Sequence, residues 1–241
     1  MESKKIDIGI AARGRNGRKT SEDRYSVSEH MVGVYDGHGG SEVSEYTSKH
    51  LPRVFQATQD FVVAFEQVDK DMEEYDSVMH RMAGTTATCA HFTPQGICIA
   101  NVGDSRAILI PPKEGDVQVL TVEDNCRTNV EEVNRIKQCG GRVIEHRVDR
   151  ILAVTRAIGD GDFRESGVIP KPHIVHVATP PAGSILVLAT DGLWDVVSSE
   201  GVRQALNSVE SVSAQVLANL LLEKAVSRRT MDDTTVMVIK F

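Results

Sequence analysis

Two short apolar runs, each delivering an Asp-Gly pair, constrain the fold of this chain more than any other feature. The runs are Met31–Tyr35 and Ile185–Ala189, and continuous apolar stretches of this length are typical of buried strands. Asp36-Gly37 follows the first run and Asp191-Gly192 follows the second. Either pair alone is also a common hairpin turn. Because the chain repeats the arrangement, we expect carboxylates at the ends of buried strands.

The first of these turns continues as Gly37-His38-Gly39-Gly40. Its glycines let the backbone turn sharply and leave no side chain that would block a ligand. A carboxylate, an imidazole and bare backbone therefore lie within a few residues of one another. The turn indicates a ligand site, with a simple connecting turn as the alternative.

The other patterns predict strands that come in runs between a few helices. Helices are expected over residues 41–56, 60–75 and 130–139 and from Ser213 onward; the second carries Phe61, Ala64, Phe65, Val68 and Met72 on one face, which indicates a core helix. Further strands are expected at Ile6–Ile10, Tyr25–Val27, Thr85–Phe92, Gly96–Val102, Ala107–Ile110, Ile151–Arg156 and Thr234–Phe241, with turns at 101–106 and 158–162 and an irregular link at 170–172. Runs of strands without strict β-α-β alternation favour an α+β layered fold of antiparallel sheets and flanking helices.

Composition limits the possible classes of protein. The chain has 241 residues with 41% hydrophobic residues, which fits one compact domain over residues 1–241. A net charge of -7 argues against general nucleic-acid binding, and no apolar run is long enough to span a membrane. The first twelve residues lack the apolar region of a signal peptide. We expect a monomer, because nothing signals an oligomer.

The four cysteines, at positions 89, 98, 126 and 139, form no Cys-x-x-Cys pair. Reduced thiols in a cytoplasmic or nuclear protein are the default for such spacing. The basic loop from Arg13 to Thr20 superficially suggests a phosphate-binding P-loop. It fails that motif, because Arg18 stands where Gly must precede the Lys.

Asp36, Asp191 and Asp232 share one context, since each lies where a predicted strand ends or begins. Singly, each is more often a turn residue or a helix cap. Together, uncompensated carboxylates would repel one another and have raised pKa values, a problem that a divalent cation removes. Oxygen ligands without nearby Cys or His pairs favour Mg²⁺ or Mn²⁺ over Zn²⁺.

The chain closely resembles the type 2C protein phosphatases, the metal-dependent serine/threonine phosphatases. The resembling segments cover nearly the whole chain in the family's order: Arg18–Asp23, Gly33–Gly40, Ala83–Ala87, Asn101–Arg106, Leu152–Asp160, Ala189–Val196 and Asp232–Val236. Each segment is weak evidence alone, and seven in sequence are strong. The resemblance implies an α-β-β-α sandwich of two antiparallel sheets, with phosphorylated proteins as substrates.

The resemblance also implies the metal ligands. Asp36 would bridge two Mg²⁺ or Mn²⁺ ions, the Gly37 carbonyl would bind one, and Asp191 and Asp232 would hold the other. Glu22 and Asp23 would hold metal-bound waters; Asp104 with Asp191, joined by Asp195, would form the weaker third site of some members.

The family's reaction, as the resemblance implies it, is in-line attack on phosphorus by a hydroxide that bridges the two metals. Arg18 would bind the phosphate oxygens as a fork, which Lys cannot reproduce. His38 would protonate the departing serine or threonine oxygen.

Two departures from the family pattern and two rival functions remain open. The flap begins with Glu123-Asp124-Asn125 instead of Asp-His-Lys, and Asp233 replaces the usual Asn, where it would tighten metal binding or face solvent. A pseudo-phosphatase binding module would usually lack a metal aspartate, and none is missing. A hydrolase of small phosphate esters such as nucleotides would need stacking aromatics, and aromatic residues are only 5% of this chain.

Overall fold

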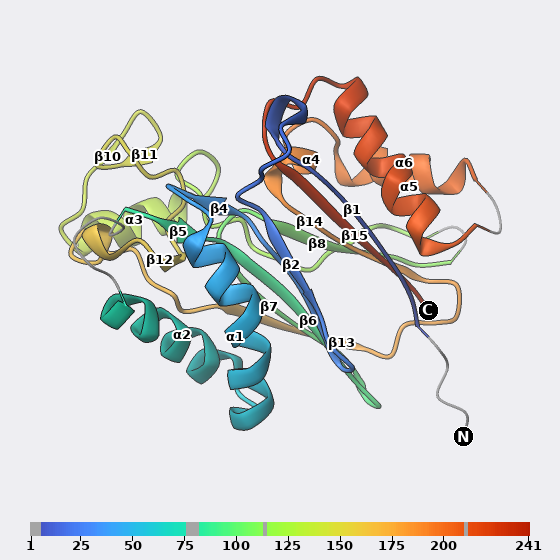
Figure 1. The fold of residues 1–241 in the computed structure, drawn as a ribbon, viewed down its shortest axis with the longest axis horizontal. Helices are drawn as coiled ribbons and strands as arrows, with labels where there is room; N and C mark the ends of the chain where they lie inside the picture. The colour runs from blue at the N-terminus through green and yellow to red at the C-terminus, as the bar shows by residue number, and fades with distance from the viewer. Residues whose placement is uncertain (1–5, 76–81, 113–114, 210–211) are drawn as a thin grey trace.

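Two five-stranded antiparallel sheets pack face to face, with helices on both outer surfaces (Figure 1). The structure is a computed structural model that describes residues 6–75, 82–112, 115–209 and 212–241. The strand orders are β1-β15-β14-β8-β9 in the first sheet and β13-β7-β6-β3-β2 in the second. This arrangement confirms the predicted α+β, four-layer α-β-β-α sandwich.

The elements of the two sheets have the following bounds. The first sheet comprises β1 (Asp7–Arg13), β15 (Thr234–Lys240), β14 (Ile185–Ala189), β8 (Arg106–Ile110) and β9 (Gln118–Val119). The second comprises β13 (His173–Ala178), β7 (Gly96–Val102), β6 (Ala87–Thr93), β3 (Met31–Tyr35) and β2 (Arg24–Val27). A small third sheet joins β12 (Ile158–Gly159), β5 (Gly84–Thr85) and β4 (Gly37–His38).

The two apolar runs are continuous because both faces of each strand are covered. In β3, Val32 and Val34 pack in the core between the sheets, whereas Tyr35 packs under the helices α1 (Glu42–Thr58) and α2 (Phe61–Tyr75). In β14, Leu186 and Leu188 likewise face the other sheet. Its alternate residues face α4 (Asp191–Trp194), α5 (Ser199–Asn207) and α6 (Ala214–Ser227). The runs therefore form the centre of the sandwich, as predicted.

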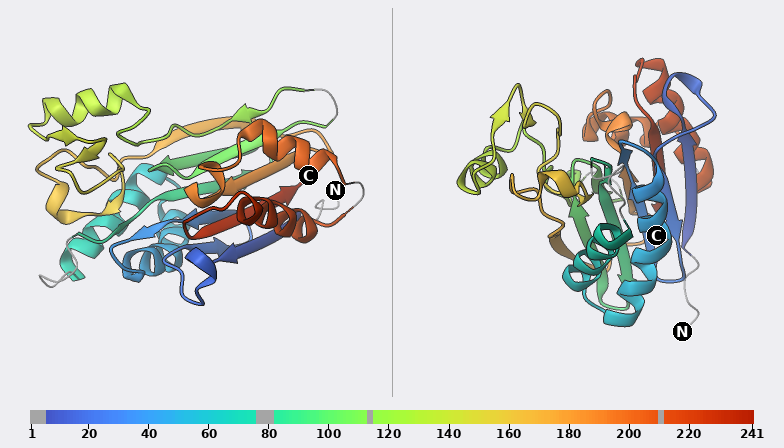
Figure 2. Two further views of the ribbon diagram at one scale, coloured as in Figure 1. Left: turned by 90° about the horizontal axis from the view of Figure 1, so that it is seen from above. Right: turned by 60° about the vertical axis from the view of Figure 1, so that its left-hand side comes forward.

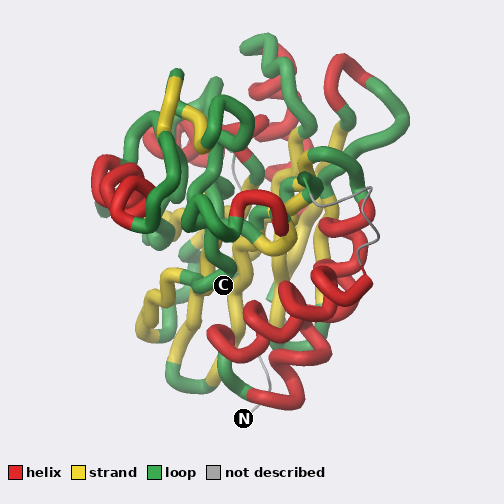
Figure 3. Tube along the Cα trace, turned by 90° about the vertical axis from the view of Figure 1, so that its left-hand side faces the viewer, coloured by secondary structure: helices red, strands yellow, loops and turns green. Residues whose placement is uncertain are grey.

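The helices agree with the predicted apolar faces. The five α2 residues named above are all buried, which confirms that they form core and not a site. Ser213 caps α6 by accepting a hydrogen bond from the backbone N–H of Val216. Viewed from one end, the strands lie in the centre with helices around them (Figure 3). No helix in the described part of the chain is long and apolar enough to cross a membrane.

A flap, residues 120–172, projects from one end of the sandwich (Figure 2). It contains α3 (Val130–Gln138), the hairpin of β10 (Val143–Ile144) and β11 (Arg147–Val148), the strand β12, and the 3-10 helix η2 (Gly161–Phe163). The flap has a small hydrophobic core of its own around Ile136, Leu152 and Phe163. It is therefore held in shape locally and does not depend only on the two sheets.

Several predicted elements were wrong or missed. Residues 151–156 are not a strand, because Leu152, Val154 and Arg156 bridge to three different partner segments and the two apolar residues pack in the flap core. The predicted turn at 158–162 contains β12 and η2. Strand β13 and helix α5 were not predicted, and β1 continues to Arg13. These segments depend on partners distant in sequence.

Candidate active site

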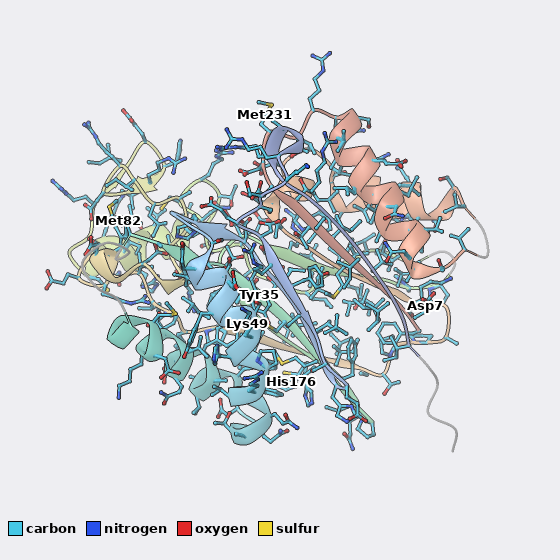
Figure 4. The ribbon with its side chains drawn as sticks, in the orientation of Figure 1. Asp7, Tyr35, Lys49, Met82, His176 and Met231 are labelled. Atoms are coloured by element: carbon cyan, nitrogen blue, oxygen red, sulfur yellow. The ribbon has the colours of Figure 1, made fainter. Side chains whose placement is uncertain are left out.

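A cavity of about 460 Å³ opens at the end of the sandwich beneath the flap. Its lining brings together the carboxylates of Glu22, Asp36, Asp104, Asp191 and Asp232 with Gly37, His38, Gly39, Thr86, two arginines and a wall of apolar flap residues. Met82 belongs to this lining and lies on the side from which the flap projects (Figure 4). Carboxylates separated by up to about two hundred residues thus share one cavity.

The ends of buried strands from both sheets deliver these carboxylates. Asp36 follows β3, where its carbonyl accepts a 2.9 Å hydrogen bond from the Thr86 N–H and its own N–H donates to Thr86 Oγ1 at 3.1 Å. Asp191 begins α4 immediately after β14. Asp232 precedes β15, which pairs with β14 in antiparallel register. The backbone therefore fixes where each carboxylate enters the cavity.

The carboxylates affect one another's ionisation. Withdrawal from water is the main cause that raises the pKa of Asp36 well above its usual value, and the charges of neighbouring aspartates, including a hydrogen-bonded contact with Asp191, raise it further. The same two causes raise the pKa of Asp104 to about 8 and that of Asp191 to about 6. A cluster of carboxylates this close together is stable only when protons or bound cations offset the repulsion between their charges.

The donor set fits hard divalent cations, because five residues with carboxylate side chains line one cavity and no cysteine is among the lining residues. One oxygen of the neighbouring Asp23 carboxylate, Oδ1, is buried without a hydrogen-bond partner. No three His, Cys, Asp or Glu side chains in the described ranges already converge on a single point as a finished ion site.

Two of the predicted carboxylates lie beside the cavity and do not line it. Asp23 is buried, accepts a 2.9 Å hydrogen bond from Thr190 Oγ1, and has a pKa raised to about 7, mainly by burial. Asp195 ends α4, and burial together with the nearby Asp232 charge raises its pKa, against the opposing effect of Arg127.

His38 lines the cavity from β4 and is paired with a buried carboxylate. Its Nε2 atom lies 2.9 and 2.8 Å from the two oxygens of Asp160. Burial lowers the pKa of His38, but the charge of Asp160 and the hydrogen bond to it outweigh that effect, and the net pKa is raised. No local pattern indicates this pairing, because Asp160 lies 122 residues from His38 in the chain.

Two arginines that were not predicted for the site line the cavity. They are Arg15 and Arg147, whereas Arg18 is not part of the lining; all three side chains are exposed. Arg15 belongs to the basic loop that the sequence already singled out, but nothing local distinguished it from its neighbours. Arg147 lies on the flap strand β11, and no motif marks it.

Asp233 is partly buried and hydrogen-bonded to the basic loop, so it does not simply face solvent. Its carboxylate accepts hydrogen bonds from the backbone N–H of Arg15 at 2.5 Å, the backbone N–H of Glu22 at 2.6 Å and the Ser21 hydroxyl at 2.8 Å. It therefore ties the basic loop and Glu22 to the start of β15.

Glu123 and Asp124, at the altered start of the flap, contact residues at the ends of strands outside the flap. Glu123 forms an ion pair with Arg106. The Asp124 carboxylate lies 2.8 Å from His173 Nε2 and accepts a hydrogen bond from the Gly103 N–H at 3.2 Å. These contacts join the flap to the ends of β7, β8 and β13.

Comparisons with known proteins agree with this geometry. The family model described as "Protein phosphatase 2C" matches residues 11–234. "Probable protein phosphatase 2C 55" of Oryza sativa subsp. japonica is 35% identical over 93% of this chain and 63% of its own length. "Protein phosphatase 1B" of Rattus norvegicus is 30% identical over 86% of this chain and 61% of its own length. The chain thus spans less than two thirds of these relatives.

Solved structures share the fold at lower identity. A C. elegans sex determining protein superposes with a TM-score of 0.88 at 22% identity, covering 100% of this chain and 66% of that one. A phosphatase from a pathogenic strain of Toxoplasma gondii gives a TM-score of 0.83 at 22% identity, covering 98% and 95%. The family model matches most of the chain, and the sandwich fold agrees with that match. This chain therefore belongs to the protein phosphatase 2C family.

Proposed function

We propose that the chain is a metal-dependent protein serine/threonine phosphatase that hydrolyses phosphoserine and phosphothreonine. The observation that carries the proposal is the meeting of five carboxylates and an imidazole in one cavity, at the ends of strands from opposite sheets. The naming of its relatives as protein phosphatases supports the same reaction.

Asp36, the Gly37 carbonyl, Asp191 and Asp232 are the groups proposed to hold two Mg²⁺ or Mn²⁺ ions. Glu22 and Asp23 would act through waters, and Asp104 with Asp191 and Asp195 would hold a weaker third ion. Bound cations of this kind lower the pKa of a water, which makes a nucleophile available near neutral pH. The carboxylates neutralise part of that positive charge and fix its position in the cavity.

The remaining residues of the cavity would bind the phosphoryl group and assist departure of the alcohol. The guanidinium groups of Arg15 and Arg147 lie in the lining and can pair with phosphate oxygens. Arg18 keeps this role only as a prediction from the family motif. His38 would donate a proton to the serine or threonine oxygen as its bond to phosphorus breaks.

The test is turnover of a phosphothreonine peptide by the whole chain, with Mn²⁺ or Mg²⁺ and with a chelator. We expect activity that requires the ion, and a loss of at least about 100-fold in Asp191→Asn. Full activity in chelator, or normal turnover by that variant, would refute the metal-dependent reaction. A nucleotide assayed in parallel tests the rival function, and preference for the nucleotide would overturn the assignment to protein substrates.

We also propose that the protein is a monomer and that it is located in the cytoplasm or nucleus.

A further inference from the structure

The small third sheet brings His38 to a carboxylate that lies 122 residues away in sequence. In the order β12-β5-β4, Gly84 of the middle strand pairs with His38 on one side and with Gly159 on the other. Asp160 follows Gly159 directly. The imidazole and the carboxylate therefore meet across a strand that has no side chain at the crossing point.

Gly84 makes this approach possible. A Cβ at that position would lie 2.6 Å from His38 Nε2 and closer still to an oxygen of Asp160. Any residue other than glycine would push the pair apart. The absence of a side chain at Gly84 is therefore a requirement of the His38–Asp160 contact.

Asp160 itself is held rigidly. Its N–H donates to the Ala83 carbonyl at 2.8 Å, its carbonyl accepts from the Phe163 N–H at 2.9 Å, and its side chain is fully buried. Its φ of 57° is in the left-handed region, where Asp is more tolerated than most residues. The main chain at Asp160 is thus fixed by contacts that do not involve His38.

His38 is the side chain that satisfies this buried carboxylate. Within the residues that the structure describes, no other side chain hydrogen-bonds the Asp160 oxygens. The neighbouring acid Asp69 instead binds Arg164 and the Gly159 N–H, so the ion pair that stabilises this turn does not involve Asp160. A buried carboxylate without a partner is costly, which makes its pairing with the imidazole a specific arrangement.

The two nitrogens of His38 are therefore in different surroundings. Nε2 faces Asp160, and Nδ1 has no hydrogen-bond partner in the described part of the chain. The side chain remains 30% exposed and lines the cavity. A carboxylate at one nitrogen holds the proton there and orients the ring, so the other nitrogen is the one available to a reacting group.

We propose that Asp160 is the positioning residue for His38: it holds the Nε2–H, fixes the ring, and leaves Nδ1 to deliver the proton to the leaving oxygen. This inference rests on the proposed function. As the P–O bond breaks, its electron pair goes to the serine or threonine oxygen, which takes the proton from Nδ1. The imidazolium becomes neutral imidazole with its proton kept on Nε2.

The kinetic test compares wild type, His38→Gln, Asp160→Ala, the isosteric Asp160→Asn and the His38→Gln/Asp160→Ala double variant, each on two substrates. A phosphoserine peptide has a poor leaving group that needs a proton, and p-nitrophenyl phosphate has one that does not. We expect His38→Gln and both Asp160 variants to lose about 100-fold in kcat on the peptide, much less on the aryl ester, with KM little changed. The double variant should lose no more than His38→Gln alone.

The matched control is Asp69→Asn, which disturbs the same turn through Gly159 without touching His38. We expect it to affect both substrates in equal proportion. A peptide-selective loss in Asp69→Asn as large as that in Asp160→Ala would overturn the positioning role, because disturbance of the turn alone would then explain it.

A spectroscopic readout separates this inference from the proposed function. In ¹⁵N-labelled protein, the His38 signals, assigned by their absence in His38→Gln, should show the neutral ring protonated on Nε2 in wild type and not in Asp160→Ala. Wild-type substrate discrimination or an unchanged tautomer in the Asp160 variants overturns the positioning role and leaves the phosphatase proposal standing. Equal losses on both substrates in His38→Gln would remove the acid itself, and the positioning role with it.

Discussion

Glu132 anchors helix α3 in the flap, and its replacement should destabilise the protein in a pH-dependent manner. The side chain is 6% exposed and binds Arg135, Arg156 at 2.8 Å and the Thr155 hydroxyl at 3.0 Å. Burial by itself would raise the pKa of Glu132, but the two arginines outweigh it and lower the pKa from 4.5 to about 2. The folded protein therefore favours the ionised carboxylate.

The contribution of Glu132 to the free energy of unfolding follows from this lowering of its pKa. A lowering of the pKa from 4.5 to about 2 corresponds to at most about 3 kcal/mol of stability. Because the folded pKa lies below the unfolded one, this contribution is complete above about pH 4.5 and is lost as the pH falls to about 2. Glu132→Gln should thus cost up to about 3 kcal/mol at pH 7 and little at pH 2.

The assay is urea unfolding followed by circular dichroism at several pH values, with Glu131→Gln as the matched control. Glu131 is the preceding residue of the same first helical turn but is exposed, so we expect its replacement to change stability by less than about 0.5 kcal/mol. Equal destabilisation by Glu132→Gln at pH 7 and pH 2 would refute the reasoning, as would an equal effect of Glu131→Gln.

Three further predictions concern the cavity and its supports. Gly84→Ala should cost about 1–3 kcal/mol of stability by overpacking and abolish the imidazole–carboxylate contact, which a urea titration and the ¹⁵N spectrum would detect; an unperturbed imidazole signal would contradict this. Asp233→Ala should free the loop that carries Glu22 and weaken Mn²⁺ binding measured by calorimetry, whereas unchanged affinity would show that the loop holds itself. Arg15→Ala should raise KM for a phosphopeptide more than Arg18→Ala, and the reverse order would favour the family motif over the observed lining.

The central strands, the core face of α2 and the placing of aspartates at strand ends were all predictable from the sequence. These features depend on residues close in the chain: an apolar run such as Ile185–Ala189 shows its own burial, and Asp191 follows it whatever the partners are. The motifs and their order then indicated the family and its fold. Asp36 and Asp191, which line the cavity, were singled out this way, because each follows such a run.

Only the tertiary structure decided which groups actually meet. The failed strand at 151–156 has the right alternation, but its residues pair with three different segments. The presence of Arg15 and Arg147 in the cavity lining and the pairing of His38 with Asp160 depend on which strands and loops lie side by side. A local sequence pattern indicates which residues of a segment are buried. These contacts depend instead on the packing of segments distant in sequence, which no local pattern encodes.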